Sequence, residues 1–225
     1  AFFENFDIYK YIRHFCLPAL MGERKDVKSL TLMAFECGMG EQPYSLSIMV
    51  NEAMPELADW NVSILGVDSC ASNIHRARQG LYLSSELDGG IPQALMGKSF
   101  EKAHRTWRVL QKHRDLVCFR PLGLSAEFKR IPECDILLLN SVLDGLEVSE
   151  RIVFLEQISL ILKPGGFVLV GGRGELDIPS LKCVRNENGV RAYRSESEHS
   201  KALSGHELSV SRSSKVQGKL RELVD

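Results

Sequence analysis

Short apolar runs alternate with segments of helical periodicity along most of this chain. The apolar runs of strand length lie at residues 30–35, 62–67, 116–119, 135–139 and 167–170. The segments in which apolar residues recur at helical spacing are 5–21, 41–54, 73–81 and 148–162. The run 135–139 is continuous, as in a strand that is covered on both faces. This alternation predicts an α/β protein with a doubly wound, mostly parallel sheet.

Two segments depart from this pattern. Residues 84–112 are polar and mixed, and we interpret them as a small insertion whose charges form a solvated face or, less simply, a docking surface. From residue 195 to 225 the chain is rich in serine and poor in large apolar residues, which is typical of a peripheral tail. We therefore expect one domain over 1–194, a small inserted subdomain at 84–112 and a tail at 195–225 that contributes little to the core.

Charge and hydropathy exclude several classes of protein. The 28 basic and 29 acidic residues leave a net charge of −1, without the basic excess of a general nucleic-acid binder. No apolar run reaches the ~20 residues that cross a bilayer, and no secretory signal opens the chain. These features predict a cytoplasmic protein without membrane insertion. The chain begins at Ala1 rather than Met, which leaves open that it is a fragment of a longer protein.

The cysteines and histidines give little support to a metal site or to disulfides. None of the six cysteines belongs to a CxxC pair, and the histidines lack the spacing of metal ligands. Several cysteines stand in apolar runs, as Cys118 does, where the side chain behaves as a small hydrophobe. We predict reduced, buried thiols and no metal.

A glycine turn provides the candidate binding site. Gly38 and Gly40 follow one predicted strand and open the next predicted helix, an arrangement in which the backbone approaches a ligand closely. A dinucleotide fingerprint needs a third glycine where this chain has Pro43, which disfavours an NAD-type oxidoreductase. Asp68 ends the next strand and is placed to accept hydrogen bonds from ribose. The pattern favours S-adenosylmethionine (SAM), and the alternative is a packing turn beside a helix-capping aspartate.

The sequence of this turn resembles the signature of a known family. Residues 40–45 read G-E-Q-P-Y-S, close to the G-E-E-P-Y-S of the CheR-type methyltransferases, which esterify glutamates of bacterial chemotaxis receptors. Further similar segments follow in the family's order: F-F at 2–3, A-R-Q-G-L-Y at 77–82, V-C-F at 117–119 and L-K-P-G-G at 162–166.

The resemblance implies a Rossmann-like class I methyltransferase fold, SAM as the cofactor, and methylation of glutamates on a chemoreceptor-like protein. The cofactor-binding residues that we predict are Cys37, Gly38, Gly40, Glu41, Asp68, Asn140 and Ser141. The family usually has a helical domain ahead of the catalytic one, and this chain starts after that point, so we expect that domain to be absent or removed. The resemblance also implies a small β-subdomain at 84–112.

The chain departs from the family at polar ligand positions. Glu4 stands where the family has an arginine that meets the SAM carboxylate, and Gly123 stands in place of an asparagine. The family's arginine and asparagine near the fourth strand are Asn140 and Ser141 here, and its Ser-Thr before G-E-E is Gly-Met at 38–39. These changes indicate altered or lost cofactor binding, and they keep open a second hypothesis: a catalytically degenerate domain that serves as a binding or scaffolding module.

Methyl transfer to a carboxylate requires no general base, because the nucleophile is already ionised at neutral pH. The lack of a Ser/His/Asp or Cys/His constellation therefore counts against a hydrolase and not against a methyltransferase. Tyr44 is our one candidate for a residue that borders the methyl group, and packed core is its alternative role.

Overall fold

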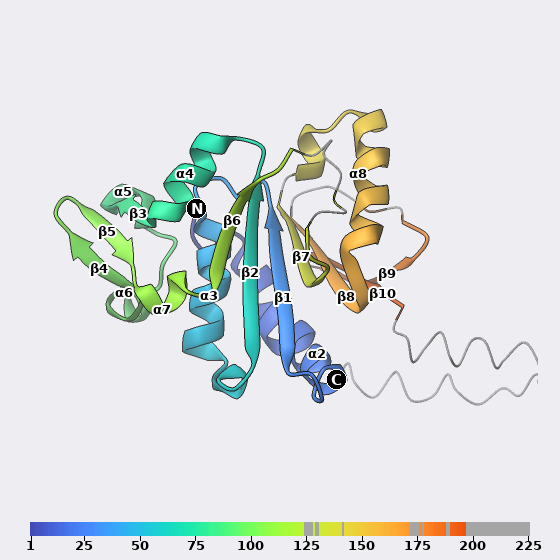
Figure 1. Cartoon of the computed structure of the whole chain (residues 1–225), viewed down its shortest axis with the longest axis horizontal. Helices are drawn as coiled ribbons and strands as arrows, with labels where there is room; N and C mark the ends of the chain where they lie inside the picture. Colours follow the sequence, from blue (N-terminus) through green and yellow to red (C-terminus); the bar gives the residue numbers. More distant parts are fainter. Residues whose placement is uncertain are drawn as a thin grey trace, which may run out of the picture.

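The computed structural model describes residues 1–123, 128, 131–140, 142–171, 176, 178–187 and 190–196. Its main sheet has seven strands in the order β6-β2-β1-β7-β8-β10-β9 (Figure 1). The strands are β1 (Ser29–Phe35), β2 (Asn61–Asp68), β6 (Val117–Pro121), β7 (Cys134–Asn140), β8 (Leu162–Gly171), β9 (Leu181–Glu187) and β10 (Val190–Ser195). The five strands from β6 to β8 pair in parallel, and β10 runs antiparallel to both β8 and β9. The predicted doubly wound, mostly parallel sheet is confirmed.

The alternation of side chains along the parallel strands creates a core on each face of this sheet. In β1, Leu32 and Ala34 face one core, and Met33 and Phe35 face the other. The first core also contains residues of the N-terminal helices, of α3 (Glu41–Ala53) and of α4 (Ala71–Gln79), and the second contains those of α8 (Val148–Ile161). Burial on both faces explains why β1 reads as an apolar run.

The helices follow the predicted segments with two adjustments. The predicted helix 5–21 is α1 (Phe6–Tyr11), a π-helical turn η1 (Ile12–Cys16) and α2 (Leu17–Glu23) in succession. The helix predicted over 73–81 spans Ala71–Gln79, because Gly80 adopts a φ of 61° and ends it. Leu81 then begins a strand, so the predicted end of this helix was wrong. The short helices η2 (Pro55–Leu57) and η4 (Val142–Gly145) complete this part of the chain.

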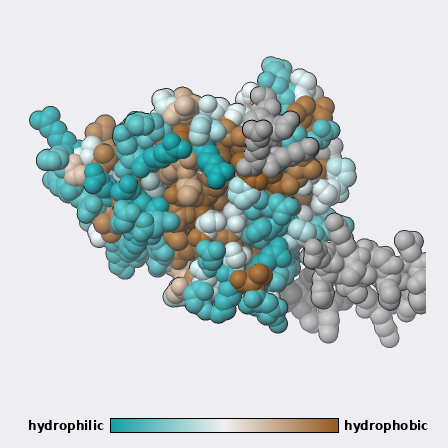
Figure 2. All heavy atoms as spheres, in the orientation of Figure 1, coloured by the Kyte–Doolittle hydropathy of each residue, from teal (hydrophilic) through white to brown (hydrophobic). Residues whose placement is uncertain are grey.

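The segment around 84–112 folds into a second, smaller sheet. Its strands β3 (Leu81–Leu83), β4 (Phe100–Ala103) and β5 (Thr106–Val109) are antiparallel and lie in the order β3-β5-β4. The helices α5 (Ser84–Leu87), α6 (Gln93–Ser99) and α7 (Gln111–Arg114) flank them. This part projects from the edge of the main sheet beyond β6, and its surface is mostly hydrophilic (Figures 1 and 2).

Two further predictions need correction. Three cysteines, Cys70, Cys118 and Cys183, are exposed rather than buried; Cys118 lies in the edge strand β6, in which only Phe119 is buried. Ser195 belongs to β10, and its hydroxyl donates a 2.8 Å hydrogen bond to the carbonyl oxygen of Lys163, so the predicted tail begins inside the sheet. Residues 197–225 lie outside the described residues. All six cysteines are free thiols.

Candidate functional site

The glycine turn joins β1 to α3 at the carboxyl end of the parallel strands. Glu36, Gly38 and Gly40 adopt φ values of 47°, 56° and 95° between the two elements. The turn is fixed to the next strand by a 3.0 Å hydrogen bond from the Cys37 amide to the carbonyl of Val67. Carboxyl ends of neighbouring parallel strands form the crevice in which open α/β sheets bind ligands. The turn therefore lies where the sequence predicted a ligand.

The two glycines of the turn serve different purposes. A Cβ added at Gly38 would meet only the Glu41 carboxylate, at 3.8 Å. A Cβ added at Gly40 would lie 2.9 Å from the Phe119 ring and 3.0 Å from Ala77. Gly40 thus permits close packing of the helix on β6 and α4, and Gly38 leaves backbone accessible to a ligand.

Asp68 is almost fully buried, at 2% exposure, and the protein already uses most of its acceptor capacity. Its carboxylate accepts hydrogen bonds from the amide of Gly38 (2.7 Å), the amide of Cys70 (2.9 Å) and the side-chain nitrogen of Asn73 (3.0 Å). Asp68 therefore holds the glycine turn against the start of α4, but it is not the cap of that helix, whose N-cap residue is Cys70. A carboxylate has about four lone-pair sites, so about one remains for a ribose hydroxyl.

Three carboxylates surround the turn. Burial, followed by the neighbouring charge of Asp68, raises the pKa of Glu36, and the Ser69 hydroxyl partly offsets this by donating to Glu36. Burial also raises the pKa of the Cys37 thiol, with further contributions from Asp68 and Glu41, so this thiol is neutral. Within the described residues no ion pair joins Glu36, Glu41 or Asp68 to a basic side chain. The site consequently favours a cation.

Replacing Glu36 with glutamine is expected to stabilise the protein at neutral pH. Because the folded pKa of Glu36 lies above its unfolded value of ~4.3, its contribution is most favourable at low pH and is lost as pH rises through the raised pKa. Glutamine keeps the acceptor for Ser69 and the backbone conformation, so the substitution removes only the charge. Urea unfolding at pH 7 and at pH 3.5 should show a gain at pH 7 that disappears at pH 3.5. Glu56→Gln, at an exposed position, is the matched control, and an equal gain in both variants would contradict this account.

The other predicted residues lie at different distances from the turn. The backbone of Phe3 donates a 2.9 Å hydrogen bond to the Ser45 hydroxyl in the first turns of α3, which brings the N-terminal segment to the helix that follows the glycines. Glu4, next in the chain, is exposed and pairs with the N-terminal amine at 3.1 Å. Tyr44 is buried, and its hydroxyl donates to the carbonyl of Ala77, so the structure places it in packed core.

The far side of the site is only partly described. The amide of Leu122 donates a 2.9 Å hydrogen bond to the carbonyl of Asp68, which places the segment after β6, with Gly123, beside the end of β2. Asn140 is the last residue of β7, two strands from β2, and Ser141 lies outside the described residues. The roles of Asn140 and Ser141 stay predictions. No group of metal-ligating side chains occurs in the part of the chain that the structure describes.

Sequence reasoning missed two residues that support the turn, and one buried polar group next to it. Phe119 fills the space beside Gly40, and the Tyr82 hydroxyl donates a 2.7 Å hydrogen bond to the carbonyl of Met39 inside the turn. The Gln42 side-chain oxygen is buried without a described hydrogen-bond partner. Phe119 and Tyr82 lie in the similar segments 117–119 and 77–82, so the motif order carried a signal, but their contacts arise only from the tertiary fold.

The strand order and the glycine turn define a class I SAM-dependent methyltransferase domain. The chain belongs to the CheR family, because the family model described as "CheR methyltransferase, SAM binding domain" matches residues 1–188. Within the described residues, no helix is long and apolar enough to span a bilayer.

Several named proteins are similar to this chain. The probable chemotaxis protein methyltransferase of Rhizobium etli is 23% identical over 197 residues, which are 86% of this chain and 73% of that protein. Chemotaxis protein methyltransferase 1 of Vibrio cholerae is 27% identical over 180 residues, which are 77% of this chain and 64% of that protein. A TehB-like SAM-dependent methyltransferase of Corynebacterium glutamicum superposes with a TM-score of 0.46 at 13% identity, over 79% of this chain and 86% of that one. The chain therefore spans 64–73% of the length of these two chemotaxis relatives.

The family implies SAM as the cofactor, and the described residues fit its cationic part. Gly38 exposes backbone at the turn, and the carboxylates of Glu36, Glu41 and Asp68 suit a sulfonium and an ammonium group. No described basic side chain pairs with this cluster, and Glu4 occupies the position at which the family resemblance predicts an arginine for the methionyl carboxylate.

Proposed function

We propose that this domain transfers a methyl group from SAM to a glutamate carboxylate of a chemoreceptor-like protein. The observation that carries the proposal is the turn at residues 36–41, in which Gly38 exposes backbone while Asp68 holds that backbone to the next strand. The family match and the names of the chemotaxis relatives support the acceptor that we propose.

The bound cofactor supplies an activated methyl group, and the tasks of this chain are binding, orientation and exclusion of water. Gly38 lets the backbone approach the ligand, and Asp68 keeps one acceptor site for a ribose hydroxyl. The negative field of Glu36 and Glu41 favours the cationic end of the ligand. The attacking carboxylate needs no base, so positioning provides the catalysis. Tyr44 has no step in this proposal, because its hydroxyl is buried and donates to a carbonyl.

A second candidate function follows from the same charges. Three carboxylates without a described basic partner repel the methionyl carboxylate, and Glu4 adds a fourth negative group near the first turns of α3. A domain with so weakened a site would serve as a binding module and not as an enzyme. Calorimetric titration with S-adenosylhomocysteine separates the two functions, because only the enzyme requires saturation at cellular concentrations.

Replacing Glu4 with arginine is expected to raise the affinity for S-adenosylhomocysteine at least tenfold, or ~1.4 kcal/mol. Arginine would supply a bidentate partner for the ligand carboxylate and would remove a repulsive charge. Titration calorimetry of both proteins measures the gain. Asp7→Arg, a charge reversal of an exposed side chain in α1, controls for long-range electrostatics. Tight binding by the unaltered protein with no change in Glu4→Arg would contradict the weakened site and favour an intact methyltransferase.

A further inference from the structure

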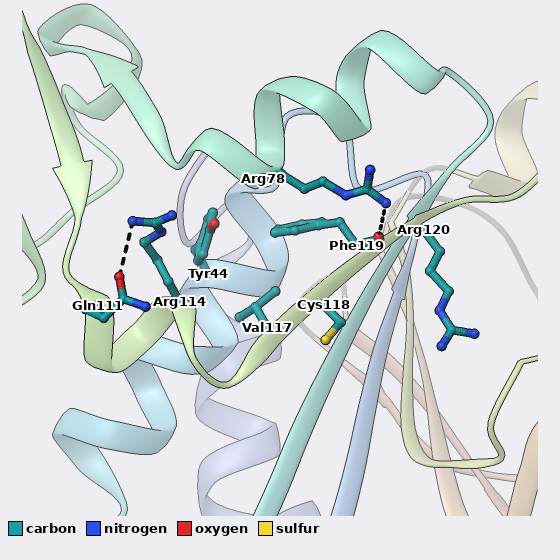
Figure 3. Close-up of a pocket in the computed structure, with 8 residues that line it drawn as sticks. All are labelled: Tyr44, Arg78, Gln111, Arg114, Val117, Cys118, Phe119 and Arg120. Atoms are coloured by element: carbon teal, nitrogen blue, oxygen red, sulfur yellow. Dashed lines mark hydrogen bonds between the residues drawn. The ribbon is translucent and has the colours of Figure 1, made fainter.

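A groove runs along the outer flank of the edge strand β6, between α4 and α7. Its volume is about 460 Å³, which lies in the range of ligand sites. The residues that line it are Tyr44, Arg78, Gln111, Arg114, Val117, Cys118, Phe119 and Arg120 (Figure 3). The charged members of this set are all arginines from three different elements. Arg78 and Arg114 lie on the same side of β6 as Tyr44, and Arg120 extends from the other side of this edge strand (Figure 3).

These three arginines have no acidic partner among the described residues. Arg78 donates a 2.7 Å hydrogen bond to the carbonyl of Phe119, and Arg114 donates to the Gln111 side chain at 3.3 Å. Asp115 lies next to Arg114 in the chain, but its carboxylate accepts from Gln111 at 2.6 Å. No carboxylate of the described residues lies within 4.0 Å of any of the three guanidinium groups.

Basic residues close to Arg78 and Arg114 on the same helices, in contrast, form ion pairs. Arg76, two residues from Arg78 on α4, pairs with Glu86 at 2.6 Å, and Lys112 on α7 pairs with Glu52. Burial raises the pKa of Tyr44 to about 12, so its phenol adds no negative charge to the groove. The groove therefore concentrates positive charge on a chain whose net charge is −1.

A further strand cannot pair with the edge strand β6 over its whole length, because two positions of its outer edge are blocked. Arg78 occupies the carbonyl of Phe119, and Pro121 has no amide hydrogen to donate. An occupant must therefore be recognised through the guanidinium groups and not through strand addition. Guanidinium groups bind carboxylates in bidentate pairs, and arginines on both sides of an edge strand suit an extended ligand that carries several carboxylates.

We propose that this groove holds an acidic peptide segment, rich in glutamate or aspartate, of the protein that the domain methylates. The identity of that partner rests on the proposed function, whereas the recognition of an acidic segment rests on the groove alone. Phe119 lines the groove and also packs on Gly40, so a segment bound there lies along the outer side of the cofactor turn. Such docking would place glutamates of the partner near the methyl donor.

The test is the binding of fluorescein-labelled hexaglutamate, measured by fluorescence anisotropy at low salt. The variant R78Q/R114Q/R120Q is expected to lose at least tenfold in affinity, or ~1.4 kcal/mol. R13Q/R105Q/R108Q removes the same charge from exposed arginines elsewhere and should lose less than about twofold, because distant charges are screened. R114Q/R120Q keeps the Arg78 hydrogen bond, so it preserves the test if the triple variant does not fold.

Several outcomes would overturn the proposal. Equal losses in the groove variant and the control variant would show that only net charge matters. Absence of saturable binding to the unaltered protein would also overturn it, as would equally tight binding of hexathymidylate through the same arginines. Titration of the groove variant with S-adenosylhomocysteine keeps the two proposals apart: lost peptide binding with retained nucleoside binding supports the groove. Peptide binding without nucleoside binding in the unaltered protein would refute the methyltransferase and leave the groove standing.

Discussion

Replacing Asp135 with alanine is expected to lower the free energy of unfolding by about 3–5 kcal/mol, because two cations would lose their buried partner. Asp135 is fully buried at the amino end of β7. Its carboxylate accepts from the Lys163 ammonium at 2.8 Å, the Arg24 guanidinium at 3.1 Å and the amide of Thr31 at 2.8 Å. It thereby joins β7 to β1, to the end of α2 and to the turn at the start of β8. Urea unfolding at pH 7 measures the loss.

The matched control is Asp59→Ala. Asp59 pairs with Lys28 at an exposed position, and such surface pairs contribute little to stability. This control should unfold at nearly the same urea concentration as the unaltered protein. If Asp135→Ala behaves like the control, the cluster around Asp135 does not stabilise the fold.

The role of Asp135 could not be predicted from the sequence. It stands at the start of the apolar run 135–139, and that run correctly predicts a doubly covered strand. Of its cationic partners, Arg24 lies 111 residues before it in the chain, and Lys163 lies 28 residues after it. Local pattern shows that a strand is buried, but it does not show which distant side chains neutralise a charge within it.

The limits of the fold prediction have the same physical origin. Strands β1, β2, β7 and β8 are covered on both faces, so their apolar runs identify them. Strand β9 lies at the edge of the sheet and exposes most of its described side chains, so its residues carry no apolar signal. The strands of the small sheet are three or four residues long, too short for a period to emerge.

The candidate site was predictable in its backbone and not in its contacts. The glycines and Asp68 follow from the strand–turn–helix order and from the G-E-Q-P-Y-S motif. That Asp68 already accepts three hydrogen bonds, and that Phe119 fills the space at Gly40, depends on how β6 and α4 pack. The arginine groove is hidden in a similar way, because a net charge of −1 is a sum over the whole chain and does not show that three arginines from separate elements line one groove.

Replacing Gly40 with alanine is expected to lower the free energy of unfolding by about 2–5 kcal/mol. Part of the loss, ~1–2 kcal/mol, is the cost of the left-handed conformation at a φ of 95°. The remaining ~1–3 kcal/mol is overpacking, because the new methyl group would lie 2.9 Å from the Phe119 ring. Urea unfolding measures the loss, and Gly97→Ala, at an exposed helical position with open space around it, should be neutral or slightly stabilising.

Replacing Gly38 with alanine is expected to cost less stability than Gly40→Ala and to weaken ligand binding more. Its φ of 56° costs ~1–2 kcal/mol of stability, but no atom nearer than 3.8 Å opposes the new methyl group. That methyl group would cover the backbone that faces the ligand, so the affinity for S-adenosylhomocysteine should fall at least about tenfold. Calorimetry of both glycine variants at a temperature where each is folded decides the matter. If Gly40→Ala lost the ligand while Gly38→Ala kept it, the backbone at Gly38 would not be the ligand-binding surface, and the site would have to lie elsewhere on the carboxyl edge of the sheet.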